Sequence, residues 1–167
     1  MKETLNIALI QTSLGWEAPA MNREHLDKLM DTIDANSQLL VLPEMFSTGF
    51  TMEPQNLTEK QARSTLLWMQ ELAFSKGMAV VGSLVWPENG NYYNRLFFVF
   101  SDGTYQYYDK RHTFTLAGED KIYSAGQERL IVDYAGFKIC PLICYDLRFP
   151  VWSRNTMDYD ILLYVAN

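Results

Sequence analysis

LLVLP, residues 39–43, sets the fold class expected of this chain, because it is a short apolar run between two helical patterns. Four apolar residues closed by a proline are typical of a buried strand. Amphipathic helical spacing precedes this run at 21–33 and follows it at 58–75, and further apolar strand runs lie at 5–10 and 78–86. Strands that alternate with helices in this way predict an α/β layered fold with a mixed sheet.

Turn signals in the second half of the chain add hairpins to this pattern. We expect the strand at 78–86 to end at Pro87, and Ser101-Asp102-Gly103 to join strands at 95–100 and 104–108. A second hairpin is expected at Tyr134-Ala135-Gly136, before a strand run at 137–143. The pattern closes with a short helical candidate at 151–155 and a strand run at 161–165. Since no repeat or low-complexity segment interrupts it, we predict a single domain over 1–167.

Composition and charge exclude several classes of protein. Hydrophobic residues make up 48% of the chain, which is enough to bury a core. The 14 Lys and Arg against 20 Asp and Glu give a formal net charge of −6, so the overall field repels nucleic acid and anionic membrane surfaces. Apolar runs such as 96–100 are far shorter than the roughly 20 residues that span a bilayer. The first residues lack the apolar centre and cleavage site of a signal peptide, so we expect a cytoplasmic location.

Both cysteines lie in ICPLICYDLRFP, residues 139–150. In a strand, Cys140 and Cys144 would stand about 13 Å apart, whereas a disulfide needs Cα atoms within about 7 Å, so neither a disulfide nor a redox pair is expected. His25 and His112 are distant from them in sequence, and we therefore expect no metal site. Cys144 ends the apolar run, where side chains meet ligands in layered α/β folds, which makes it the candidate nucleophile. Cys140 lies inside the run and is expected to be a buried packing residue.

A catalytic thiol needs a base or a cation beside it. Glu44 directly follows LLVLP, and Lys110 follows the strand run at 104–108, so both lie at the end of an apolar run, as Cys144 does. Taken singly, Glu44 is also readable as a loop charge and Lys110 as a surface lysine. His112 is an alternative base, but no Asp or Asn in the sequence marks itself as its orienting partner, and His25 is expected to face solvent.

Four segments carry a resemblance to a known family. PEMFSTGF from Pro43, YDKRHTF from Tyr108, LAGEDKIYSAG from Leu116 and ICYDLRFPVWSRN from Ile143 resemble, in order, the signature segments of the nitrilase superfamily of carbon-nitrogen hydrolases. The first and last segments look most like the omega-amidase branch. That branch hydrolyses the side-chain amide of 2-oxo dicarboxylic acid monoamides such as 2-oxoglutaramate.

The resemblance implies a catalytic triad of Glu44, Lys110 and Cys144, with Glu119 as a supporting glutamate. Glu44 would take the thiol proton, and Cys144 would attack the amide carbonyl to form a thioester. Lys110 and the backbone N–H of Tyr145 would stabilise the tetrahedral oxyanion. Glu119 would orient Lys110 or Glu44 rather than touch the substrate.

The distal carboxylate of such a substrate would need an arginine or a group of backbone N–H donors. Arg148 and Arg111 are the candidates, with a salt bridge to Asp146 or to another carboxylate of the scaffold as the alternative role for Arg148. Three aromatic residues near glycine-containing turns are candidates for the pocket wall, with ordinary packing as the alternative: Phe46, Phe50 and Tyr145.

The resemblance also implies a four-layer α-β-β-α sandwich, a small-molecule amide substrate, no cofactor and a homodimer. Two alternatives remain open: a related hydrolase acting on a nitrile, an N-carbamoyl group or another amide, and a non-catalytic binding protein. Family members continue beyond the segment YDILLYVAN, in which 161–165 is expected to form a buried strand. We therefore expect the C-terminal part of the sandwich to be missing here and the functional polypeptide to extend beyond Asn167.

Overall fold

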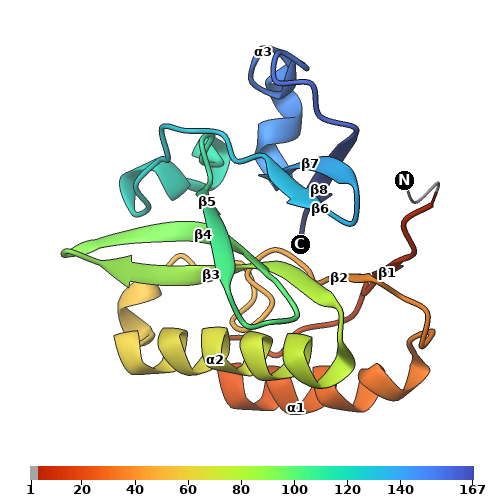
Figure 1. Ribbon diagram of the computed structural model, residues 1–167. Coiled ribbons are helices and arrows are strands. Elements are labelled where there is room, and N and C mark those ends of the chain that lie inside the picture. The colour runs from red at the N-terminus through yellow and green to blue at the C-terminus, as the bar shows by residue number, and fades with distance from the viewer. Residues whose placement is uncertain (1–3) are drawn as a thin grey trace.

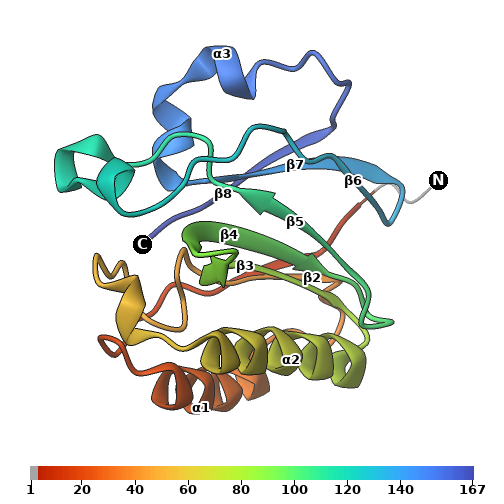
Figure 2. The same ribbon diagram turned by 90° about the vertical axis from the view of Figure 1, so that its left-hand side faces the viewer.

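The computed structural model describes residues 4–167 as stacked layers of helices and sheets (Figures 1 and 2). Helices α1 (Pro19–Leu29) and α2 (Glu59–Lys76) cover one face of a five-stranded sheet, and a three-stranded sheet lies against its other face. On the outer side of the second sheet lies the short helix α3 (Pro150–Ser153). This α-β-β-α order of layers is the predicted one.

The larger sheet contains parallel and antiparallel strands in the order β1-β2-β3-β4-β5. Strands β1, β2 and β3 are parallel, and β4 and β5 add to them as antiparallel hairpins: β1 (Ile7–Leu9), β2 (Leu39–Val41), β3 (Ala79–Glu88), β4 (Asn91–Val99) and β5 (Tyr105–Asp109). The smaller sheet has the order β6-β7-β8, with β7 and β8 parallel: β6 (Val132–Tyr134), β7 (Phe137–Ile143) and β8 (Ile161–Val165).

Strand β2 shows why the apolar run LLVLP folds as it does. Side chains alternate along a strand, so Leu40 packs into the core shared with the helices, while Leu39 and Val41 pack into the core between the two sheets. All three residues are buried because each face of the strand is covered. The prediction that this run forms a buried strand is confirmed.

Local sequence signals mark both ends of helix α2. At the start of α2, the side chain of Thr58 accepts a hydrogen bond from the backbone N–H of Gln61, and the Gln61 side chain bonds back to the Thr58 N–H. The helix ends at Gly77, whose φ of 65° suits glycine. Helix α1 is shorter than the predicted 21–33, because the chain tightens into a 3₁₀ turn over Met30–Thr32.

The hairpins are confirmed, with one correction. Strand β3 does not end at Pro87 but continues to Glu88, and Pro87 lies opposite Tyr92 of β4. Among the described residues, β3 pairs beyond Val81 with β4 alone, so Pro87, which has no N–H, removes no hydrogen bond to a second neighbouring strand. The turn follows at Asn89 and Gly90, which both have positive φ.

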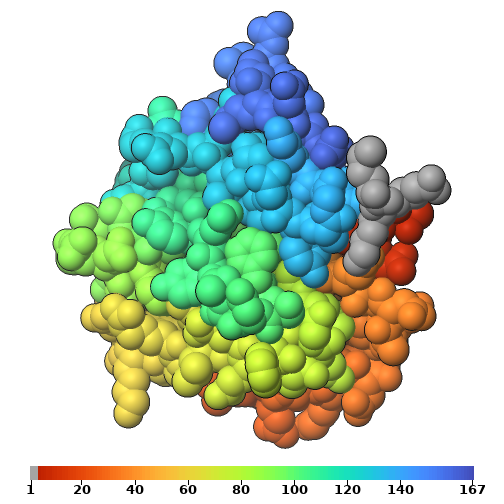
Figure 3. Space-filling model, in the orientation of Figure 1, coloured from red at the N-terminus to blue at the C-terminus, as the bar shows by residue number. Residues whose placement is uncertain are grey.

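Strand β8 is less covered than its apolar sequence predicts. It pairs with β7 alone among the described residues, and only its last residue, Val165, is buried. Leu162 is 38% exposed. Figure 3 shows the C-terminal third of the chain lying directly against the β4–β5 region on one face of the molecule.

Within residues 4–167, no helix is both long and apolar enough to cross a membrane.

Candidate active site

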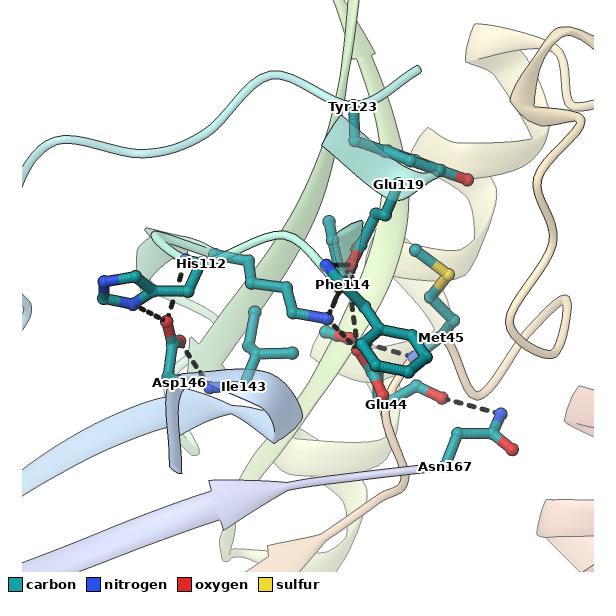
Figure 4. A network of polar contacts seen from close by, with 12 residues as sticks. Glu44, Met45, His112, Phe114, Glu119, Tyr123, Ile143, Asp146 and Asn167 are labelled. Carbon is teal, nitrogen blue, oxygen red and sulfur yellow. Dashed lines mark hydrogen bonds and ion pairs between the residues drawn. The ribbon is translucent and has the colours of Figure 1, made fainter. Parts of the chain in front are cut away.

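A buried charge cluster joins three segments that are far apart in sequence. Glu44 follows β2, Lys110 follows β5, and Glu119 begins a 3₁₀ turn over Glu119–Lys121; each is at most 1% exposed. Lys110 Nζ lies 2.8 Å from Glu44 Oε1 and 3.0 Å from Glu119 Oε2. Figure 4 shows the carboxylates of Glu44 and Glu119 turned toward this common centre. The structure thus brings three of the predicted residues into direct contact.

The two carboxylates decide the charge of Lys110. Burial alone would lower the pKa of its ammonium, but the charges and hydrogen bonds of Glu44 and Glu119 outweigh it, so the pKa is raised. Lys110 is therefore a fixed cation, suited to stabilising negative charge rather than to accepting a proton. Two carboxylates around one ammonium leave the cluster with one excess negative charge.

The loop from Phe114 to Tyr123 is folded around Glu119. The backbone N–H of Phe114 donates to Glu119 Oε2, and the N–H groups of Glu119 and Tyr123 bond to the carbonyls of Phe114 and Glu119. Gly118 turns the chain just before Glu119 with a φ of 80°. The carboxylate is therefore held by its own loop as well as by Lys110.

Asn94 belongs to this cluster, although the sequence analysis did not identify it. It is buried on β4, and its Nδ2 donates to Glu44 Oε1 at 2.8 Å and to Glu119 Oε1 at 3.3 Å. The available signal was a lone amide within the aromatic and apolar run YYNRLFF, where a polar side chain needs buried partners.

Cys144 lies where β7 ends and the 3₁₀ turn Cys144–Arg148 begins. Its φ is 39°, a left-handed conformation that is unfavourable for a residue with a Cβ and is often found at functional sites. The side chain is half-buried, whereas Cys140 is fully buried within β7, and both thiols are free. The structure therefore places only Cys144 at the end of the strand.

The surroundings of Cys144 favour the neutral thiol. Burial raises its pKa to about 11, and the negative charge of Glu44 and a hydrogen bond to Glu44 act in the same direction. The charge of Lys110 and a hydrogen bond from the backbone of Asn167 oppose them. Because the resting sulfur keeps its proton, attack on a substrate requires that proton to be removed as the bond forms.

A second polar network surrounds Asp146 and corrects the expectation that His112 has no orienting acid. Fully buried Asp146 lies 2.8 Å from His112 Nδ1, and it also accepts from the backbone N–H groups of His112 and Ile143 and from the hydroxyl of Tyr108. The His112 ring stacks on Phe149 at 3.8 Å. Asp146 thereby ties the segment that carries Lys110 to the turn that carries Cys144 (Figure 4).

The two predicted carboxylate-binding arginines have different surroundings. Arg111 Nη1 donates to the carbonyl of Gly126 and to Gln127 Oε1, at 3.0 and 2.9 Å, so its head group is engaged there. Arg148 is exposed, and the expected salt bridge to Asp146 is not formed because Asp146 faces inward. Across the described part of the chain, Arg148 has no side-chain hydrogen bond or ion pair, so its guanidinium is available to a ligand.

The aromatic candidates divide in the same way. Phe46 is completely buried and packs on Trp68 with ring centroids 5.7 Å apart, so it is a core residue rather than part of a pocket wall. Phe50 lies under Lys110, whose Nζ is 5.4 Å from the ring centroid. Phe50, Phe114 and Tyr145 form a chain of ring contacts beside the charge cluster.

The segment after β8 lies against Glu44. The N–H of Glu44 donates to the carbonyl of Ala166, and Asn167 Nδ2 donates to the carbonyl of Glu44. A cavity of about 440 Å³ adjoins this contact, between the ends of β1 and β2 and residues 164–167. In the described residues, no set of three or more His, Cys, Asp or Glu side chains is arranged to hold a metal ion.

Comparisons with known proteins agree with the resemblance seen in the sequence. An omega-amidase of Yersinia enterocolitica is 43% identical over 98% of this chain, and a 2-oxoglutaramate amidase of Bacillus subtilis is 30% identical over 89%. The crystal structure of XC1258 from Xanthomonas campestris, a CN-hydrolase superfamily protein with an arsenic adduct in its active site, superposes with a TM-score of 0.93 at 40% identity and covers 98% of this chain.

These matches span 63%, 59% and 64% of the three proteins, so the chain covers less than two thirds of their length. The family model for carbon-nitrogen hydrolases matches residues 6–167, which is nearly all of the chain. The layered fold, the similarity to named amidases and this match agree with one another, and the chain belongs to the carbon-nitrogen hydrolase family.

Proposed function

We propose that the protein is an amidase that hydrolyses the side-chain amide of a 2-oxo dicarboxylic acid monoamide, such as 2-oxoglutaramate, to the acid and ammonia. The observation that carries this proposal is the buried Glu44–Lys110–Glu119 cluster beside the strained, protonated Cys144. The similarity to an omega-amidase and to a 2-oxoglutaramate amidase supports the choice of substrate class.

The first half of the reaction forms a thioester. Glu44 accepts the proton of the Cys144 thiol while the sulfur attacks the amide carbonyl. The resulting oxyanion is stabilised by the Lys110 ammonium and by the backbone N–H of Tyr145. When the tetrahedral intermediate collapses, the carbon–nitrogen bond breaks, and Glu44 returns its proton to the departing ammonia.

The second half releases the acid. A water molecule gives a proton to Glu44 as its oxygen attacks the thioester carbonyl, and the same two donors stabilise the second oxyanion. Collapse breaks the carbon–sulfur bond and returns the proton to Cys144. Glu119 touches neither substrate nor water in this scheme, and it serves to hold Lys110 in place.

Arg148 is the proposed partner of the distal carboxylate of the substrate. It is the last residue of the turn that begins at Cys144, and its guanidinium is exposed, whereas the Arg111 head group is already engaged by Gly126 and Gln127. An arginine binds a carboxylate through two parallel hydrogen bonds, which would fix the direction in which the amide enters.

A cytoplasmic location and a homodimer complete the proposal. Three apolar side chains near the site are widely exposed, and a second copy of the chain would cover them: Leu116, Leu147 and Val151. Light scattering during size-exclusion chromatography tests the dimer, and a mass equal to one chain at all concentrations would refute it.

The function is tested by measuring ammonia released from 2-oxoglutaramate, asparagine, simple nitriles and N-carbamoyl amino acids. We expect the 2-oxo amide to have the highest kcat/KM. Preferred turnover of a nitrile or an N-carbamoyl substrate would place the protein in another branch of the family. Absence of any turnover by folded protein would favour the binding-protein alternative.

A further inference from the structure

Asn94 contacts all three charged residues of the buried cluster. Its side-chain Nδ2 donates to Glu44 Oε1 and to Glu119 Oε1, and its backbone carbonyl accepts from the N–H of Lys110 at 3.0 Å. The residue lies on β4, so it belongs to a rigid strand rather than to a loop. One side chain thus spans the gap between the two carboxylates.

The cluster needs such a neutral donor. Glu44 and Glu119 both contact the same ammonium, and two negative charges so close together repel strongly in a buried environment. Lys110 supplies only one positive charge for the two carboxylates. An amide N–H donates hydrogen bonds to both without adding charge. The titratable groups around the cluster come from four segments, because Glu119 and Tyr123 share one loop: Glu44, Lys110, Glu119, Tyr123 and Cys144.

The orientation of the amide is set by these carboxylates alone. Asn94 Oδ1 has no hydrogen-bond partner among residues 4–167, so every polar contact of the side chain goes to the two glutamates. If the amide were reversed, its oxygen would face the oxygens of two carboxylates, and acceptors would repel one another. A buried acceptor without a protein partner is unfavourable, and an apolar residue at this strand position would avoid it. The amide is therefore better explained by the carboxylates than by packing of the strand.

The hydrogen bonds also distinguish the two oxygens of Glu44. Lys110 and Asn94 both donate to Oε1, whereas no N–H group in the described chain donates to Oε2. The charge of this carboxylate also acts on the Cys144 thiol, so the two groups are neighbours. With Oε1 occupied twice, Oε2 is the oxygen left to receive the thiol proton.

We propose that Asn94 is a positioning residue of the hydrolytic site, which holds Glu44 through Oε1 so that Oε2 faces Cys144, and which keeps Glu119 alongside Lys110. This inference rests on the proposed role of Glu44 as the base. It assigns Asn94 no contact with the substrate, so its loss should affect kcat much more than KM.

Two isosteric substitutions test the proposal. Asn94→Leu keeps the shape and removes the donor, and Asn94→Asp keeps one donor only while its carboxyl is protonated. Val85→Ala is the matched control, because Val85 is buried opposite Asn94 in the β3–β4 register and carries no polar group. Each variant is compared with wild type in amide hydrolysis and in alkylation of Cys144 by iodoacetamide, followed by peptide mass spectrometry across the pH range. In the alkylation, the sulfur–carbon bond forms, iodide leaves and the thiol proton passes to Glu44.

We expect Asn94→Leu to lower kcat about 10- to 100-fold, the range for losing hydrogen bonds to a charged group. Its rate relative to wild type should recover as pH rises, because carboxylates left without the donor hold a proton more readily. For Asn94→Asp the relative rate should fall as pH rises, because the donor is lost on ionisation. If Asn94 had a purely structural role, the rate of each variant relative to wild type would not depend on pH, as we expect for Val85→Ala.

The proposal would be overturned if the rates of both Asn94 variants relative to wild type did not depend on pH. It would also be overturned if their loss of kcat were no larger than that of Val85→Ala. If Asn94→Leu fails to fold cooperatively, the direction of the pH dependence of Asn94→Asp decides alone. If wild-type protein hydrolyses no amide, the proposed function is wrong, and the alkylation measurements still decide the role of Asn94.

Discussion

Replacing Glu44 by glutamine should make the nucleophile more acidic and the protein inactive at the same time. The substitution preserves size but removes the negative charge that, after burial, does most to raise the pKa of Cys144, and it replaces one carboxylate oxygen by an NH₂ donor. The opposing charge of Lys110 remains. The thiol pKa should therefore fall from about 11 toward its ordinary value of 9.0, without reaching it, because the sulfur stays half-buried.

The size of this change is measurable. With a pKa of about 11, roughly one thiol in a thousand is ionised at pH 8, and with a pKa near 9 this becomes about one in ten. Hydrolysis should nevertheless fall by about 10²–10⁴-fold, the usual contribution of a general base, because no group remains to carry the proton to ammonia. Thioester formation should be blocked in the same variant.

The assay is an ultraviolet titration of the thiolate in a Cys140→Ala background, together with mass spectrometry of the protein shortly after mixing with substrate. Cys140→Ala is a suitable background because Cys140 is fully buried and contacts none of the charged cluster. An unchanged or higher thiol pKa would refute the reasoning about Glu44 and Cys144. A normal burst of acyl-enzyme would assign the base elsewhere, and His112, oriented by Asp146, would be next in line.

Three further predictions follow from the same geometry. Cys144→Ala should abolish hydrolysis while Cys140→Ala keeps most of it, as measured by ammonia release, and equal losses in folded variants would contradict a single nucleophile. Lys110→Ala should lower kcat by about 10²–10³-fold through the lost oxyanion donor, and single-turnover kinetics showing normal acylation would exclude that role. Asp146→Ala should reduce the free energy of unfolding by about 1–3 kcal/mol, the cost of leaving buried donors unsatisfied, and an unchanged urea midpoint would argue against the network.

Much of this architecture is readable from the sequence, because its strands are apolar runs closed by clear turn signals. LLVLP predicted a buried strand, and the sequence placed Glu44 and Cys144 at the ends of apolar runs, where the structure also has them. Both inferences use local sequence patterns, which do not depend on contacts with distant parts of the chain.

What the sequence did not predict depends on contacts between distant segments. Asn94 is one polar residue inside an apolar run, and only the approach of Glu44 and Glu119, 50 and 25 residues away, gives it partners. Asp146 looked like a partner for Arg148, but in the 3₁₀ turn its side chain points inward to Tyr108 and His112. Local patterns do not report which way a side chain points in a turn.

The origin of the reacting groups in different layers has a consequence for adaptation to temperature. Glu44 and Lys110 extend from the five-stranded sheet, and Cys144 from the three-stranded one, so any sliding between the sheets changes the distance over which the proton must move. The Asp146 network resists that sliding at one end, and the side chains between the sheets resist it elsewhere. A substitution between the sheets, such as valine by isoleucine, changes this resistance without touching the substrate. Homologous sequences can thereby gain activity at low temperature and lose stability at high temperature, or the reverse.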